Sequence, residues 1–178
     1  QVLSILLKLR QVCCHPKLFL PDYEGSSGKL ELLVQIVHNA IAAKRRMLIF
    51  SQFVGMLQMI RKRLGREGIQ TLYLDGETRP DKRQELCDRF NGGEGRVFLI
   101  SLKAGGTGLN LTGADLVIHY DPWWNPAAED QATDRAHRIG QTHDVDVVKL
   151  IAQGTIEEKV TDLSKRKRAV FDRVVMAG

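Results

Sequence analysis

Short apolar runs alternate along this chain with segments whose apolar residues recur at helical spacing. Five runs are rich in β-branched or aromatic residues, which predicts buried strands at 47–50, 71–74, 97–101, 116–120 and 145–151. Helical spacing covers 54–67 and 79–90, and each of these segments lies between two of the runs. This repeated order of strand, helix and strand predicts an α/β fold with a mostly parallel sheet covered by helices on both faces.

The two ends of the chain have a different pattern. Residues 1–14 predict an apolar-rich helix that ends at His15-Pro16, and 20–28 has the Pro, Gly and Ser content of a loop or linker. A further helix is expected over about 29–43. Near the other end, Thr155 and Glu158 fit a capping box that opens a helix with Ile156, Val160 and Leu163 on one stripe.

Composition narrows the class of protein. With 178 residues, 43% of them hydrophobic, the chain has the size and apolar content of one globular domain. It carries 26 Lys and Arg against 21 Asp and Glu, a modest basic excess that favours a polyanionic partner without proving one. No apolar run is long enough to span a membrane, and no signal peptide is recognisable. We therefore expect a soluble, intracellular protein without a membrane partner, and the missing initiator Met suggests a piece of a longer one.

Two short motifs suggest ligands and fail on their spacing. "GSSGKLEL" resembles a phosphate-binding loop, but Tyr23 and Leu30 stand where the P-loop pattern needs Gly and Ser or Thr, and no strand precedes it. "CCHP" suggests zinc, yet adjacent residues cannot easily face one tetrahedral ion and no second ligand pair follows. With three cysteines in a domain of this length, a disulfide framework is not expected either. We predict no metal site and no P-loop in this chain.

The segment from Ser101 to Pro126 is richer in candidate chemistry. Gly105, Gly106 and Gly108 follow a predicted strand and would let the backbone approach a ligand closely, while Ser101, Lys103 and Thr107 offer donors for a phosphate. A Gly-rich turn without a ligand explains the glycines equally well. The two tryptophans of "DPWWNP" predict loop packing if buried and a contact surface if exposed.

"QATDRAHRIGQT" places two arginines three residues apart. In a helix from Pro126 to about Arg138, the side chains of Gln131, Arg135 and Arg138 fall within roughly 60° of one another at ~100° per residue. This face is either a solvated basic surface or a set of donors that stabilises charge on a transferring phosphoryl group. Because the chain has no phosphate cradle of its own, the second reading requires a nucleotide that is held elsewhere.

The motifs taken together resemble the C-terminal RecA-like lobe of superfamily-two helicases, specifically the Swi/Snf-like DNA-dependent ATPases. The combination of "GGTGLNL", "DPWWNP" and "DRAHRIGQ" carries most of this resemblance and distinguishes it from the RNA-helicase branch. The matching blocks follow one another in order over nearly the whole chain: "LRQVCCHPKL", "SGKLELL", "MLIFSQF", "LDGETRPDKRQELCDRFN", "LISLKAGGTGLNLTGADLVIHYDPWWNP", "QATDRAHRIGQTHDVDVVKLI" and "GTIEEKV".

The resemblance implies a role for each matching position. The catalytic residues would be Arg135 and Arg138, reaching across a cleft to ATP on a first lobe outside this chain. Contacts to the nucleotide would come from Gln131, Gly108 and Asn110. Contacts to the DNA would come from Asp75, Gly76, Thr78, Ser101, Leu102, Lys103 and Trp124.

The implied protein is an ATP-dependent translocase or remodeller of double-stranded DNA, with ATP and Mg²⁺ bound mainly by a P-loop lobe of the same protein. We expect 1–28 to be a helix and linker from that lobe, 29–153 the RecA-like lobe and 154–178 a brace-like helix. This chain alone would be inactive. DNA-bound protein complexes are possible further partners, and the protein would be nucleoid-associated or cytoplasmic in a bacterium and nuclear in a eukaryote. A non-catalytic nucleic-acid-binding module and a Rossmann-type nucleotide-binding enzyme are the alternatives.

Overall fold

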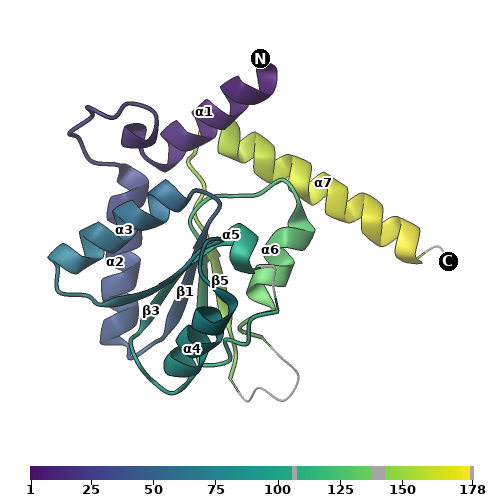
Figure 1. Ribbon diagram of the computed structural model, residues 1–178. Coiled ribbons are helices and arrows are strands. Elements are labelled where there is room, and N and C mark those ends of the chain that lie inside the picture. Colours follow the sequence, from purple (N-terminus) through teal and green to yellow (C-terminus); the bar gives the residue numbers. More distant parts are fainter. Residues whose placement is uncertain (106–107, 138–142, 177–178) are drawn as a thin grey trace.

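The computed structural model describes residues 1–105, 108–137 and 143–176, with side chains up to Arg173. Its centre is a five-stranded, fully parallel sheet in the order β2-β3-β1-β4-β5 (Figure 1). The strands are β1 (Met47–Ser51), β2 (Thr71–Leu74), β3 (Val97–Ser101), β4 (Leu116–His119) and β5 (Asp146–Lys149). The predicted α/β fold with a parallel sheet is therefore confirmed.

Helices cover both faces of this sheet, as the sequence predicts. Strand residues alternate between the faces, so that Ile49 packs on one side and Phe50 on the other. The Ile49 side is covered by α2 (Gly28–Ala42) and α3 (Val54–Arg66). The Phe50 side is covered by α4 (Pro80–Asn91), the short α5 (Leu102–Gly105) and α6 (Pro126–Thr133). Strands β1, β3 and β4 are buried throughout, which is why they read as continuous apolar runs.

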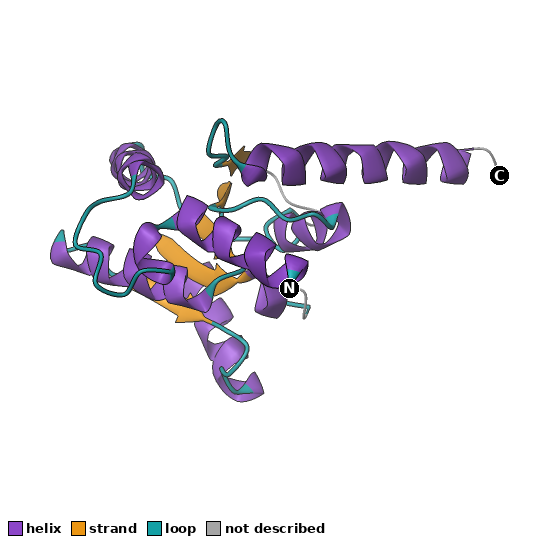
Figure 2. Ribbon diagram, turned by 90° about the horizontal axis from the view of Figure 1, so that it is seen from above, coloured by secondary structure: helices purple, strands orange, loops and turns teal. Residues whose placement is uncertain are grey.

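The two terminal helices lie beyond the sheet. Helix α1 (Val2–Cys14) ends where His15 accepts a hydrogen bond from the nitrogen of Lys17 and opens the 3-10 turn η1 (Pro16–Leu18). Helix α7 (Ile156–Met176) begins after Thr155, whose hydroxyl accepts a hydrogen bond from Glu157 N at 3.1 Å. It passes beside α1 and projects away from the sheet (Figures 1 and 2). Within the described ranges, none of the helices combines the length and apolar character needed to cross a membrane.

Two elements are clearly shorter than predicted: the strand expected at 145–151 covers only Asp146–Lys149, and α6 is shorter than the expected helix. The helix expected from Pro126 to about Arg138 ends at Thr133, and residues 134–136 continue as turns. The carbonyl of Arg135 accepts a hydrogen bond from Leu111 N at 2.9 Å, so a tertiary contact engages the backbone where a longer helix would need it. Sequence periodicity alone gives no sign of that contact. Arg135 therefore lies beyond the helix rather than on its face.

Candidate nucleotide and DNA interface

Most of the residues assigned to ligands lie where the parallel strands end. In α/β proteins this edge of the sheet is the usual place for ligands, because the loops after the strands converge there. Asp75 follows β2, Ser101 ends β3, and the segment with Trp124 follows β4. The sequence-predicted residues thus come from several loops but share one edge of the sheet.

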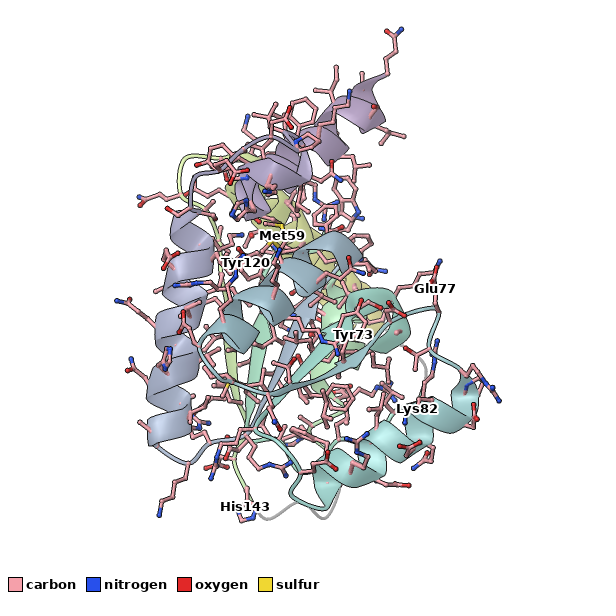
Figure 3. All side chains as sticks on the ribbon, turned by 60° about the vertical axis from the view of Figure 1, so that its left-hand side comes forward. Met59, Tyr73, Glu77, Lys82, Tyr120 and His143 are labelled. Carbon is pink, nitrogen blue, oxygen red and sulfur yellow. The ribbon has the colours of Figure 1, made fainter. Side chains whose placement is uncertain are left out.

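The turn after β2 is tied together by its own polar groups. Burial favours the neutral form of Asp75, but hydrogen bonds from Tyr73 Oη (2.8 Å), Glu77 N (2.9 Å) and Thr78 outweigh it and lower the pKa of Asp75. Arg83, from α4, stabilises the turn by donating hydrogen bonds to the carbonyls of Thr78 at 2.7 Å and Gly76 at 3.0 Å. Figure 3 shows Glu77 at the outer tip of this turn.

The segment after β3 is compact. Ser101 is buried, and its hydroxyl accepts a hydrogen bond from Ala104 N at 3.3 Å. Lys103 is exposed, whereas Leu102 packs into the core. A Cβ at position 105 would lie 2.8 Å from Phe50 Cε1, so any larger residue would displace the Phe50 ring, and glycine permits this close approach to β1. Of these residues, only Lys103 presents an exposed charged side chain to a ligand.

The residues assigned to the nucleotide come together from two segments. Gly108 is exposed with a φ of +73°, a conformation that favours glycine, and Asn110 is exposed beside it. The hydrogen bond from Leu111 N to the carbonyl of Arg135 joins this segment to the end of α6. Arg135 is half-buried, and its Nε donates to the carbonyl of Gln131 at 2.9 Å. The remaining predicted arginine, Arg138, lies outside the described residues, as do Gly106 and Thr107.

The tryptophan loop, residues 121–125, packs against α1. Both tryptophans are half-buried, and their ring centroids lie 6.2 Å apart. The guanidinium carbon of Arg10 lies 4.5 Å from the centroid of Trp124 and 5.1 Å from that of Trp123. Trp124, predicted as a DNA contact, is thus partly covered by an arginine from the first helix. Its remaining exposed part is all that a DNA strand could contact.

Sequence reasoning missed two buried polar groups at this edge. Asp121 is fully enclosed: burial raises its pKa, while hydrogen bonds from Ser51 Oγ and Gln52 N act in the opposite direction. His119 is 1% exposed, stacks on Phe50 and lies 3.1 Å from Thr133 Oγ1 in α6. Burial lowers the pKa of His119 to about 4, so the ring is neutral at neutral pH. His119 lies within a predicted strand and Asp121 directly follows it, and this position was the only signal in the sequence.

The lysine of the rejected P-loop motif has a structural role instead. Lys29 Nζ lies 2.7 Å from Glu157 Oε2 and donates to the carbonyls of Tyr120 (3.1 Å) and Leu150 (3.3 Å), at the ends of β4 and β5. The side chains of Lys29 and Glu157 are 6% and 2% exposed. Tyr120, labelled in Figure 3, is buried, and the centroid of its ring lies 5.3 Å from Lys29 Nζ. The buried ion pair fixes the start of α7 to the sheet.

Comparison with known proteins places this geometry in a family. The model of the helicase conserved C-terminal domain matches residues 28–140. A putative ATP-dependent helicase/translocase of Bacillus subtilis is 42% identical over 182 residues, covering 99% of this chain and 20% of that protein. Helicase swr1 of Aspergillus fumigatus is 43% identical over 152 residues, which cover 85% of this chain and 9% of the length of swr1. The chain therefore spans a fifth or less of the length of these relatives.

Solved structures agree with the sequence relatives. The SWI2/SNF2 ATPase core of Sulfolobus solfataricus in complex with dsDNA superposes with a TM-score of 0.81 at 38% identity, covering 99% of this chain and 38% of that one. The C-terminal part of the Fun30 ATPase domain has a TM-score of 0.75 at 35% identity, covering 89% of this chain and 54% of that one. The fold is thus shared with these ATPase structures.

Proposed function

Because the chain belongs to the helicase conserved C-terminal domain family and forms the C-terminal lobe of a Swi2/Snf2-type ATPase core, we propose that it is the second motor lobe of an ATP-dependent double-stranded DNA translocase. The rest of the motor is a P-loop lobe of the same protein, which holds ATP and Mg²⁺. ATP binding closes the cleft between the lobes and hydrolysis reopens it. Because each lobe binds the DNA backbone, this repeated closing and opening moves the motor along the duplex.

One observation supports the nucleotide side of this proposal most directly. The Leu111–Arg135 hydrogen bond joins the segment with Gly108 and Asn110 to the end of α6, so these residues and Gln131 can face one ligand together. Arg135 and Arg138 are the arginines that would stabilise the charge developing on the γ-phosphate held by the other lobe. Gln131, Gly108 and Asn110 would contact the nucleotide, whose ribose and phosphates require close approach of the backbone.

The DNA side of the proposal uses the loops after β2, β3 and β4. The turn with Asp75, Gly76 and Thr78, the segment from Ser101 to Lys103, and Trp124 would contact the sugar-phosphate backbone. Such contacts carry no base information, which suits a motor that must move over any sequence. The similar ATPase core from Sulfolobus solfataricus was solved in complex with dsDNA, and this supports duplex DNA as the nucleic acid along which this protein translocates.

Many apolar side chains of the terminal helices remain exposed and suit a large intramolecular partner. Leu3 and Ile5 of α1 are 75% and 57% exposed, and Val170 and Phe171 of α7 are 62% and 67% exposed. Exposed apolar groups of this size are candidates for burial against another domain. We propose that the P-loop lobe covers part of them, with α7 acting as a brace between the lobes. DNA-bound protein complexes are proposed as further partners of the whole protein.

The decisive experiment is steady-state ATP hydrolysis by the intact protein with no nucleic acid, duplex DNA, single strands and RNA. We expect the largest stimulation with duplex DNA. Arg138→Ala should lower the stimulated turnover by about 10³ or more, and Arg138→Lys should rescue little, because lysine keeps the charge but loses the planar fork. Arg89→Ala is a matched control, since Arg89 pairs with Glu94 near the opposite edge of the sheet.

Two outcomes would contradict the proposal in different ways. An intact protein that hydrolyses no ATP with any of these nucleic acids would leave the non-catalytic nucleic-acid-binding module as the better account of the basic charge. A folded Arg138→Ala protein that keeps more than about a tenth of the stimulated turnover would return Arg138 to a solvated surface and leave Arg135 as the remaining candidate.

A further inference from the structure

Arg10 lies in an unusual position for an arginine, because its side chain is buried although most of α1 is exposed. Its side chain is 4% exposed and is enclosed by aromatic rings: Trp124 at 4.5 Å, Trp123 at 5.1 Å and Phe53 at 6.0 Å from the guanidinium carbon. Its Nη2 donates to the carbonyl of Pro122 at 3.2 Å. The guanidinium thus contacts three consecutive residues of the tryptophan loop.

Burying this cation has a cost that its contacts only partly offset. Burial lowers the pKa of Arg10, whereas the charges of Asp121 and Glu157 act in the opposite direction. A leucine or methionine would fill the same space without losing hydration. What a guanidinium adds is geometry, because a planar cation stacks on indole faces and donates to a carbonyl at a fixed angle. Arg10 therefore constrains the orientation of the tryptophan loop more than an apolar residue would.

The tryptophan loop is itself joined to α6. Glu129 Oε1, on the first turn of α6, accepts a hydrogen bond from Trp123 N at 2.7 Å, and Glu129 Oε2 pairs with Lys149 of β5 at 2.6 Å. A continuous series of contacts thus runs from Arg10 in α1 through the loop to α6. That helix carries Gln131 and leads into Arg135.

We propose that Arg10 is a positioning residue for DNA-dependent ATP turnover: it sets the orientation of Trp124, and so links α1 to the DNA contact and to the helix that leads to the arginines. This inference rests on the proposed DNA role of Trp124. Arg10 itself contacts neither DNA nor nucleotide in this scheme.

The test compares Arg10→Met with the unchanged intact protein. The measurement is the duplex concentration that gives half-maximal ATPase stimulation. We expect Arg10→Met to raise it about tenfold, which corresponds to about 1.4 kcal/mol and lies within the range of a desolvated cation–π contact. Arg10→Lys should keep most of the defect because lysine cannot stack as a plane. Lys8→Met is the matched control: Lys8 lies on the same helix over the ring of Phe19, at 5.6 Å, and should leave the half-maximal concentration unchanged.

A double-mutant cycle with Trp124→Ala separates positioning from a general loss of stability. If Arg10 acts through Trp124, adding Arg10→Met to Trp124→Ala should cause no further rise in the half-maximal duplex concentration. All rates are measured well below the melting temperature of each variant. Should Arg10→Met not fold, the cycle is run with Arg10→Lys.

Several results would overturn the inference. They are additive effects in the cycle, full rescue by Arg10→Lys, an equal defect in Lys8→Met, or a lower melting temperature with normal DNA dependence. In each case the unchanged protein is still stimulated by duplex DNA, so the proposed function stands. Only an unchanged protein without stimulation by duplex DNA removes the proposed function, and the inference falls with it.

Discussion

His119 should make the lobe sensitive to mild acid, and replacing it should remove that sensitivity. The imidazole is 1% exposed in β4, stacked on Phe50 with ring centroids 5.6 Å apart. His119→Phe keeps a ring of similar size against Phe50 and has no titrating group. The replacement also loses the contact with Thr133 Oγ1, which should cost about 1 kcal/mol at pH 8.

The magnitude follows from the pKa of His119 in the two states. Burial lowers the pKa from its ordinary value of 6.5 in the unfolded chain to about 4 in the fold. The unfolded state therefore binds a proton first as the pH falls, and the folded state loses stability through the window from pH 6.5 to 4. The loss is about 2 kcal/mol between pH 8 and pH 5, and about 3 kcal/mol below pH 4.

Urea denaturation of residues 1–178 at pH 8, 7, 6 and 5 provides the assay, with unchanged and His119→Phe proteins measured side by side. The difference between their free energies of unfolding cancels other titrating groups, including the buried Asp121. We expect the variant to be slightly less stable at pH 8 and more stable at pH 5. If the difference stays constant within about 0.5 kcal/mol across this range, His119 is not held neutral by burial and the reasoning is wrong.

Three further predictions concern the Lys29–Glu157 ion pair, the binding of DNA and the proposed P-loop lobe. Lys29→Met should destabilise the lobe by about 3 to 5 kcal/mol because it leaves Glu157 buried and unpaired, and adding Glu157→Leu should recover much of that loss in urea titrations; additive losses would contradict this. The affinity of residues 1–178 for DNA, measured by fluorescence anisotropy, should not depend on the DNA sequence and should fall steeply as salt is added. Tight binding to one DNA sequence at high salt would contradict binding through the sugar-phosphate backbone alone. Purified residues 1–178 should hydrolyse no ATP above buffer in a phosphate-release assay, and measurable turnover would refute the two-lobe arrangement.

The fold could be predicted from the sequence because strands that are buried on both faces of the sheet need apolar residues, and the helices that cover them need apolar residues at helical spacing. β1, β3 and β4 are apolar at every position except their last, and α3 presents Leu57, Ile60 and Leu64 to the sheet. Motif order then identified the family, since the Gly-rich segment, the tryptophan loop and the arginine segment follow one another in a specific combination. These features depend on local periodicity and spacing, which the sequence states directly.

The contacts within the candidate site were decided by tertiary structure alone. Nothing in the sequence indicates that Arg10 stacks on Trp124, 114 positions away, or that Lys29 pairs with Glu157. The end of α6 was mispredicted for the same reason, because the carbonyl of Arg135 is engaged by Leu111 N from a separate segment. A buried polar group takes whichever partner the packed chain brings within hydrogen-bond distance, and leaving it unpaired costs more than a local propensity can offset. Such pairings therefore depend on the three-dimensional path of the chain and not on the pattern of neighbouring residues.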